Sequence, residues 1–200
     1  AIRSVKFVLA SGNQHKADEI RVLLPSHFEL ILQKSLGVES PDETGTTFIE
    51  NAIMKAKHAS LATGLPAIAD DSGLCVPFLS GGPGVYSARY AGPEATDIDN
   101  LLKLLSALEG ASNRRAFFYC VLVHMETDLD PTPIITVARW EGEIAHEPLG
   151  DYGFGYDPIF RIPSLGITAA EMSNEQKNSI SHRGQALTAL SGLLNDRYAT

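Results

Sequence analysis

Apolar and polar positions follow two different periods along the chain, and these periods predict where strands and helices lie. In the first half, short apolar runs predict buried strands over residues 5–10, 28–32 and 67–69. Apolar residues at helical spacing predict helices over residues 15–24 and 48–62, and Pro25 ends the first of them. Strands that alternate with helices in this way are typical of an α/β fold.

The second half of the chain combines longer strands with further helices. Strands of antiparallel type are predicted over residues 115–125, 134–140 and 143–147. Helices are predicted over residues 96–110, directly after Ser173, and over residues 182–194 with Leu187, Leu190 and Leu194 facing inward. The whole pattern predicts a mixed sheet flanked by helices, and without repeats or linkers residues 1–200 read as one domain.

The helix over residues 48–62 opens with a capping box, Thr47-x-x-Glu50, which satisfies free backbone donors. A second box, Thr96-x-x-Asp99, opens the later helix. Phe48 and small residues form the apolar face of the first helix, while Lys55 lies on a different face. An exposed, solvated side chain is the simplest interpretation of Lys55.

Composition and charge narrow the partners that this chain can have. Hydrophobic residues make up 44% and charged residues 20%, an ordinary balance with enough apolar material for a core. The formal net charge is −8, which argues against nucleic acid or an anionic membrane as partner, because both attract a basic surface. A phosphorylated small molecule is still compatible, since a divalent cation can lie between carboxylates and phosphates.

Targeting and redox signals also bear on where the protein works. No apolar run is long enough to cross a bilayer, and the apolar run near the start is too short for a signal-peptide core. Cys75 and Cys120 both lie in apolar stretches, which favours buried free thiols over a disulfide or a metal site. These features favour a cytoplasmic protein that binds no membrane.

Two adjacent carboxylates, Asp70 and Asp71, directly follow the apolar run at residues 67–69. Ligands of α/β sheets bind at the carboxyl ends of strands, and adjacent carboxylates repel each other unless positive charge is near. Their side chains would point to opposite faces of a strand, so one could bind a metal while the other accepts hydrogen bonds. A simple turn before Gly73 is the alternative, and we favour the metal interpretation.

The stretch SGNQHK, residues 11–16, lies between a predicted strand and a predicted helix. Free backbone N–H groups at a helix N-terminus form a ready anion site. Lys16 falls in the first helical turn, where the helix dipole disfavours a cation unless an anion such as phosphate is bound. A solvated surface lysine is the alternative, because the stretch is not a complete P-loop pattern.

Three further groups of polar residues fall in loops. Asp42 and Glu43 precede a helix, where carboxylates are favoured by the helix dipole alone. Phe154 and Tyr156 stand between glycines, which leaves room for a flat ring to approach an aromatic face. His182 and Arg183 start a helix, and cations are disfavoured there unless an anion or a carbonyl oxygen is present.

These loops together resemble the inosine triphosphate pyrophosphatase family, also called the Ham1 or RdgB-type family. The motifs that carry the resemblance are, in chain order, SGNQHK, PDETGTTFIENAIMKA, AIADDSGL, PGVYSARYAG, GFGYDPIF and SHRGQAL. The resemblance implies hydrolysis of ITP, dITP and XTP to the monophosphate and pyrophosphate, with Mg²⁺ as cofactor and usually as a homodimer. It also implies a long mixed sheet with two α/β lobes and a site in the cleft between them.

The resemblance also implies roles for individual residues. Glu43 and Asp71 would bind Mg²⁺ with Asp70 or Asp42 in support, and Asp71 would accept the proton of the attacking water. Lys55, Lys16 and the backbone of the first turn would offset charge on the leaving pyrophosphate. The implied substrate-binding residues are Ser11, Gly12, Asn13, Gln14, His15, Lys16, Ser72, Phe154, Gly155, Tyr156, Asp157, Lys177, His182 and Arg183.

Two positions bear on the match to the family pattern. The family commonly opens with Thr-Gly-Asn, whereas this chain has Ser11, which keeps the hydroxyl group. The acidic loop is often Glu-Glu or Asp-Glu, and here it is Asp42-Glu43. Either of these two carboxylates could be the metal ligand, and we take Glu43.

The C-terminal residues offer an account of base selection. Phe154 could stack on a purine, while Lys177, His182 and Arg183 can donate hydrogen bonds. Donors suit the 6-keto oxygen of hypoxanthine or xanthine and oppose the 6-amino group of adenine. On this account we expect Arg183→Ala to reduce ITP turnover much more than it reduces stability.

Other functions fit the same residues less well. A Maf-like nucleotide pyrophosphatase is disfavoured by the motifs SHRG and FGYDP. A nucleotide-binding sensor without turnover is disfavoured by the intact set Glu43, Asp71, Lys16 and Lys55, although only turnover decides. A Rossmann dehydrogenase is disfavoured because the first turn has no G-x-G-x-x-G.

Overall fold

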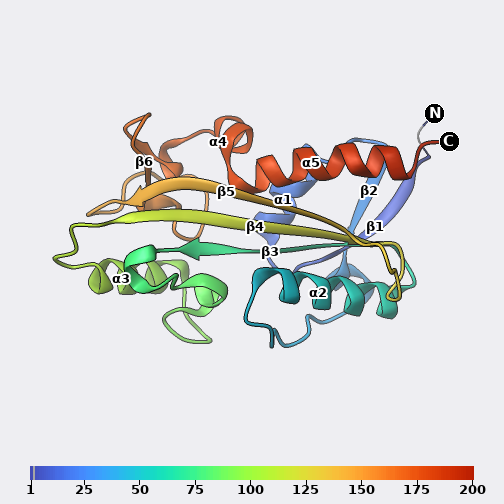
Figure 1. The fold of residues 1–200 in the computed structure, drawn as a ribbon, viewed down its shortest axis with the longest axis horizontal. Coiled ribbons are helices and arrows are strands. Elements are labelled where there is room, and N and C mark those ends of the chain that lie inside the picture. Colours follow the sequence, from blue (N-terminus) through green and yellow to red (C-terminus); the bar gives the residue numbers. More distant parts are fainter. Residues whose placement is uncertain (2) are drawn as a thin grey trace. The chain divides into compact units, whose positions relative to one another are not determined.

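The computed structural model of the protein describes residue 1 and residues 3–200. The strands are β1 (Val5–Ala10), β2 (Phe28–Leu32), β3 (Ala67–Cys75), β4 (Arg115–Met125), β5 (Ile134–Ile144), β6 (Phe160–Ile162) and β7 (Ile167–Thr168) (Figure 1). The α-helices are α1 (Gln14–Leu23), α2 (Phe48–Thr63), α3 (Asp97–Ala107), α4 (Asn174–Ile180) and α5 (His182–Arg197). No helix in these residues is both long and apolar enough to cross a membrane.

In the described residues the strands form one seven-stranded sheet in the order β2-β1-β3-β4-β5-β6-β7. β1 runs parallel to both β2 and β3, whereas β6 runs antiparallel to β5 and β7. The sheet is mixed, because the strands at one edge are parallel and joined by helices, whereas the strands at the other edge are antiparallel. The predicted mixed sheet flanked by helices is therefore confirmed.

The chain divides into two compact units. The first unit holds residues 1–71, 120–138 and 183–200, and the second holds residues 72–119 and 139–182. The three longest strands, β3, β4 and β5, contribute residues to both units. Two units agree with the two predicted lobes, while the predicted cleft between them stays a prediction.

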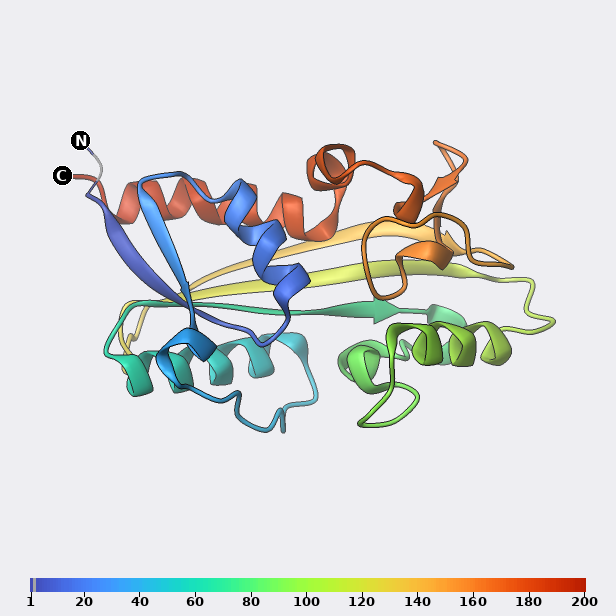
Figure 2. The ribbon, with the colours of Figure 1, turned by 180° about the vertical axis from the view of Figure 1, so that it is seen from behind.

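The first unit packs helices on both faces of its strands. Figures 1 and 2 show α5 and α2 on opposite sides of these strands. On the α5 side, Phe7 and Leu9 of β1 meet Ile20 of α1 and Leu190 of α5 in one apolar cluster. Leu187, Leu190 and Leu194 are all fully buried, which confirms their predicted inward face. On the other side, the apolar face of α2 is made of small alanines that let the helix approach the sheet closely.

The second unit has a separate, aromatic core. Leu104 and Leu108 from the α3 segment are fully buried in a cluster that also contains Phe118, Trp140 and Phe160. The ring centroids of Phe118 and Phe160 lie 4.4 Å apart, and those of Trp140 and Phe160 lie 5.0 Å apart. Aromatic pairs at such distances stabilise a core beyond the area that they bury.

β3 is longer than the sequence predicts, and this changes the setting of the two aspartates. The strand continues to Cys75, so Asp70 and Asp71 lie inside β3 and not at its end. β1 does end there, because its last residue, Ala10, pairs with Ala69. The carboxylates therefore still lie at a carboxyl end of the parallel part of the sheet, but the strand that ends is β1.

A predicted break between two later strands is wrong. Residues 134–140 and 143–147 were expected as separate strands, but β5 runs without interruption from Ile134 to Ile144. A Cβ atom on Gly142 would lie 2.6 Å from Cζ of Phe160 and 2.8 Å from the carbonyl oxygen of Arg161. The glycine thus marks a close approach of β6 to β5 and does not end the strand.

The other expectations for local structure hold with small shifts at element ends. Thr96 and Asp99 form the complete capping box of α3, and the Thr47 hydroxyl accepts a hydrogen bond from the backbone of Glu50. Cys75 and Cys120 are buried free thiols, as predicted. Burial raises the pKa of the Cys75 thiol to about 11, so this thiol is protonated at neutral pH.

A buried histidine ties the C-terminal segment to the sheet of the first unit. Nδ1 of His124 lies 3.1 Å from the carbonyl oxygen of Ala67, and Nε2 lies 3.0 Å from the hydroxyl group of Tyr198. Since a carbonyl oxygen only accepts, Nδ1 carries the proton and Nε2 accepts from Tyr198. Burial, together with the charge of Arg197, lowers the pKa of His124 to about 4, against the opposing effects of Ala67 and Asp130.

We predict that this histidine makes the fold acid-sensitive. An unfolded histidine binds a proton near pH 6.5, whereas folded His124 stays neutral down to about pH 4, so stability falls as pH drops through this window. The expected loss is about 3 kcal/mol of unfolding free energy, measured by urea titration at pH 7 and pH 4.5. His124→Gln should lose most of this pH dependence, whereas His146→Gln, at an exposed position, should keep it. Equal pH dependence in all three proteins would contradict the assignment.

Candidate active site

Asp70 is the centre of a buried ionic network in the first unit. Its carboxylate is fully buried, with Oδ1 lying 3.1 Å from Nζ of Lys16 and Oδ2 lying 2.8 Å from Nε of Arg183. The Cys120 thiol also donates to Oδ2, at 3.5 Å. Although burial opposes ionisation, the charges of Arg183 and Lys16 hold the pKa of Asp70 well below its usual range. Asp70 is therefore a permanent counter-ion for two cations.

Arg183 has a second carboxylate partner that the sequence analysis missed. Its guanidinium group also pairs with Glu19 of α1 through Nη1, and the side chain is only 2% exposed. Glu19 follows Lys16 by three residues, so both side chains project from neighbouring positions of α1. The helical spacing of Lys16 and Glu19 could have indicated that their side chains lie close together. The pairing of Glu19 with residue 183 could not be predicted, because the two are far apart in the sequence. A base contact for Arg183 stays a prediction.

Lys55 is not the exposed lysine that the simplest interpretation expects. It is only 7% exposed, and its ammonium group lies 3.2 Å from Oε1 of Glu43 and 3.1 Å from Oδ1 of Asp71. It also donates to the backbone carbonyl of Asp70 at 2.7 Å. Burial alone would lower the pKa of Lys55, but the carboxylates of Asp71 and Glu43 raise it, so the ammonium group stays charged.

Asp71 has one carboxylate oxygen in use and one open. Oδ1 accepts from Lys55, whereas Oδ2 is buried with no hydrogen-bond partner among the residues that the structure describes. Burial and the nearby charge of Glu43 raise the pKa of Asp71, against the opposing charge of Lys55. A buried oxygen left without a donor costs free energy, which marks this atom as a place for a cation or a proton donor.

The two acidic-loop residues differ in their surroundings. Glu43 is half-buried and ion-paired with Lys55, whereas Asp42 is exposed. The geometry thus brings Glu43, and not Asp42, to Asp71. Among the described residues, no group of three or more His, Cys, Asp or Glu side chains is arranged to hold a metal by itself.

The SGNQHK turn forms a capped helix start. The Ser11 hydroxyl accepts from the backbone of Asn13 at 3.1 Å, and Oδ1 of Asn13 accepts from the backbone of Lys16 at 3.1 Å. Asn13 is therefore the N-cap of α1, a structural role that suffices to explain it. Gly12, Gln14 and His15 are exposed, and Gln14 donates to Asp18. Substrate contacts of these residues stay predictions.

The second unit gathers Phe154, Asp157 and Lys177. Oδ2 of Asp157 accepts from the backbone of Phe154 at 3.0 Å and from Nζ of Lys177 at 2.6 Å. Nζ of Lys177 lies 4.7 Å from the ring centroid of Phe154, in cation–π contact. A Cβ atom on Gly153 would lie 2.1 Å from Oδ2 of Asp157, so only glycine leaves room for this carboxylate.

Tyr156, predicted as a substrate-binding residue, has a buried side chain. It is 5% exposed, and its hydroxyl donates to the carbonyl oxygen of Ser87 at 2.7 Å. A side chain packed in the core with its polar group satisfied anchors the loop, so a substrate contact is left to the backbone of this residue. Sequence reasoning could not identify Ser87 as the anchor, because it lies 69 positions away.

His182 and Ser72 complete the predicted residues of the second unit. The His182 ring is 4% exposed and stacks on Phe118, with centroids 4.7 Å apart. Its ring plane is therefore fixed by the aromatic core, and a base contact stays a prediction. Ser72 is half-buried and follows Asp71 directly in β3.

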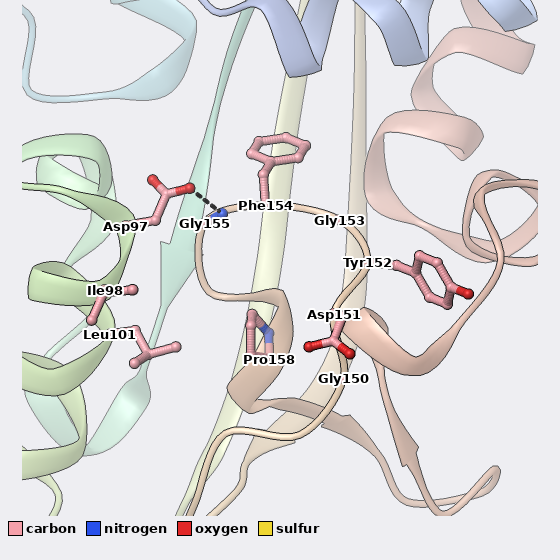
Figure 3. A pocket seen from close by; sticks show the side chains of 10 residues that line it. All are labelled: Asp97, Ile98, Leu101, Gly150, Asp151, Tyr152, Gly153, Phe154, Gly155 and Pro158. Carbon is pink, nitrogen blue, oxygen red and sulfur yellow. Dashed lines mark hydrogen bonds between the residues drawn. The ribbon is translucent and has the colours of Figure 1, made fainter.

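A small pocket lies beside the loop that carries Phe154 (Figure 3). It has a volume of about 190 Å³ and is lined by Asp97, Ile98, Leu101, Gly150, Asp151, Tyr152, Gly153, Phe154, Gly155 and Pro158. The backbone N–H of Gly155 donates to Oδ2 of Asp97 at 2.8 Å, a contact that the sequence analysis did not foresee.

Comparison with known proteins decides the family of the chain. The model of the Ham1 family matches residues 7–193. The chain belongs to the Ham1 family. This confirms the resemblance found in the sequence motifs.

Close relatives of this Ham1-family chain cover nearly its whole length. It is 56% identical over 194 residues to a dITP/XTP pyrophosphatase of Yersinia pseudotuberculosis serotype I (strain IP32953), covering 96% of this chain and 98% of the relative. It is 56% identical over 192 residues to a dITP/XTP pyrophosphatase of Nitrosomonas europaea, covering 96% and 95%. A solved HAM1 protein of Coxiella burnetii has a TM-score of 0.90 and 52% identity, covering 96% of this chain and 99% of that one.

The contacts of Arg183 add a stability cost to the expected effect of Arg183→Ala on turnover, and which of the two effects is larger stays a prediction. In Arg183→Ala, the buried carboxylate of Asp70 keeps its ion pair with Lys16 but loses the one with Arg183. The ion pair between Arg183 and Glu19 is lost as well. Breaking a buried ion pair on one side costs about 3–5 kcal/mol of unfolding free energy.

Denaturant titration of Arg183→Ala measures this loss directly. Arg115→Ala, at an exposed position, serves as the control and should change stability by less than about 1 kcal/mol. An Arg183→Ala protein as stable as its parent would show that the ionic network contributes little.

Proposed function

We propose that the protein hydrolyses non-standard purine nucleoside triphosphates (ITP, dITP and XTP) to the monophosphate and pyrophosphate. The observation that carries the proposal is the arrangement of Lys55 between Glu43 and Asp71, with the second Asp71 oxygen open. The relatives named dITP/XTP pyrophosphatase, 56% identical over almost the whole chain, support this choice of substrate. Such an activity removes deaminated purines from the nucleotide pool.

The residues present suit Mg²⁺ as cofactor. Mg²⁺ binds oxygen ligands from one or two carboxylates and completes its shell with water and substrate phosphates, so a cage of three carboxylates is not needed. Glu43 and Asp71 would hold it, and the open Oδ2 of Asp71 is the atom that the fold leaves for a cation. When bound, Mg²⁺ would orient the triphosphate and make the attacking water more acidic.

Asp71 and the two lysines would carry the remaining chemistry. The water oxygen attacks the α-phosphorus, the bond between this phosphorus and the bridging oxygen breaks, and pyrophosphate leaves with the bond electrons. Asp71 would accept the proton of the water, because its carboxylate lies at the proposed metal site where the water would be held. Lys55 and Lys16 would offset the negative charge that grows on pyrophosphate.

Base selection would belong to the second unit. Phe154 offers a ring face for stacking, and the ammonium group of Lys177, in cation–π contact with that ring, would supply a hydrogen-bond donor. Donors at this place favour a 6-keto purine over adenine. His182 and Arg183 would be further donors to the base. A homodimer stays a prediction, as does the cytoplasmic location.

Product analysis tests the proposed function. We expect IMP, dIMP or XMP together with pyrophosphate from ITP, dITP and XTP, much slower turnover of ATP and GTP, and none without Mg²⁺. Chromatography of the nucleotide products distinguishes the point of attack. Release of phosphate and a diphosphate would place the attack at the γ-phosphorus and overturn the mechanism. Binding of dITP without any turnover would favour a sensor.

The choice of Glu43 as the metal ligand can be tested against its neighbour. Glu43→Gln should raise the Mg²⁺ concentration for half-maximal activity by about tenfold or more, because a charged oxygen ligand is lost. Asp42→Asn is the matched control, since Asp42 is exposed and lies next to Glu43 in the chain. An Mg²⁺ requirement shifted by Asp42→Asn and not by Glu43→Gln would reverse the assignment.

A further inference from the structure

The loop that carries Phe154 is held by two carboxylates, one on each of two successive backbone amides. Asp157, within the loop, accepts from the N–H of Phe154. Asp97, the first residue of α3, accepts from the N–H of Gly155 at 2.8 Å (Figure 3). The second tie comes from outside the loop, because Asp97 lies 58 positions away in the chain.

Asp97 is not needed to cap its own helix. The capping box of α3 is complete with Thr96 and Asp99, whose side chains satisfy each other's backbone N–H groups at 3.1 and 2.9 Å. The helix dipole favours a carboxylate anywhere in the first turn, but it does not aim one at a distant amide. The contact between Asp97 and Gly155 therefore has its cause in the loop and not in the helix.

The two glycines that flank Phe154 do not fix its direction by themselves. Gly153 and Gly155 flank it with φ of +72° and +61°, so the backbone on both sides consists of the most flexible residue type. Phe154 is half-buried, and its position over Lys177 depends on where these two glycines are held. Asp157 secures the segment before Gly155, and Asp97 secures Gly155.

We propose that Asp97 is a positioning residue for base recognition: its bond to Gly155 holds the Phe154 ring in the orientation that stacks on the purine. Asp97 acts through the loop and does not contact the substrate. This assignment rests on the proposed function and adds to it a residue of α3 that determines how well the base is bound.

Three variants separate positioning from a general structural role. Asp97→Ala removes the acceptor and should raise KM for dITP and XTP by about tenfold, the size expected for a weakened aromatic–base stack. Its kcat should stay within about twofold, because the residues of the reacting phosphate are untouched. Asp97→Asn keeps an acceptor oxygen and should restore most of the KM. Asp99→Ala removes a first-turn carboxylate and part of the cap but leaves Gly155 bonded, so its KM should match the wild type.

Amide hydrogen exchange at Gly155, followed by NMR, reports on the bond without any substrate. The exchange should become faster in Asp97→Ala and stay slow in Asp97→Asn and Asp99→Ala. An unchanged KM in Asp97→Ala, or an equal rise of KM in Asp99→Ala, would overturn the assignment while the hydrolysis of dITP by the wild type upholds the proposed function. A wild type that hydrolyses neither dITP nor XTP would overturn both.

Discussion

A fully buried carboxylate in the middle of a sheet must find positive charge, and the first unit is organised around this need at Asp70. Removing an ion from water costs several kcal/mol of desolvation free energy, which only close groups of opposite charge offset. Lys16 from α1 and Arg183 from α5 meet that carboxylate from two helices. The same pairing fixes Lys16 at the start of α1, where the dipole alone would disfavour a cation. The position of a predicted phosphate-binding lysine thus follows from the electrostatics of its neighbour.

The two adjacent aspartates illustrate how environment divides work between identical side chains. Their positions in one strand send the side chains to opposite faces. Asp70 faces Arg183 and Lys16, and its pKa is held well below the usual range, so it serves as a fixed charge. Asp71 shares Lys55 with Glu43, and burial raises its pKa, so the two carboxylates differ in how readily they bind a proton. Two carboxylates whose pKa values are pushed apart are a common basis for assigning distinct roles in a site.

The sequence pattern predicts helices and strands well where local hydrophobic periodicity determines them. It fails where contacts with residues far apart in the sequence determine the structure. The apolar runs of β1 and β4 and the inward leucines of α5 were predicted because their burial follows from local periodicity. The continuation of β3 through two aspartates was not, because it depends on cations supplied by other elements. The continuation of β5 across Gly142 was not predicted either, because it depends on the packing of Phe160 from β6 against this glycine. Among site residues, the motifs gave Lys55 and Asp71, but Glu19 and Asp97 are recognisable only from contacts far apart in sequence.

The two units differ in how firmly they hold their functional residues. In the first unit, Lys16 and Lys55 are fixed by ion pairs that are largely shielded from water, and loss of a partner there costs stability. In the second unit, Phe154 stands on a glycine-flanked loop, and the tie from Asp97 to this loop is exposed and contributes little to global stability. On the proposed function, loss of the tie from Asp97 would therefore alter how the base is bound without unfolding the protein. Loss of a partner in the ionic network lowers stability as well, so on the proposed function a change of base binding without loss of stability is expected at the bond between Asp97 and Gly155.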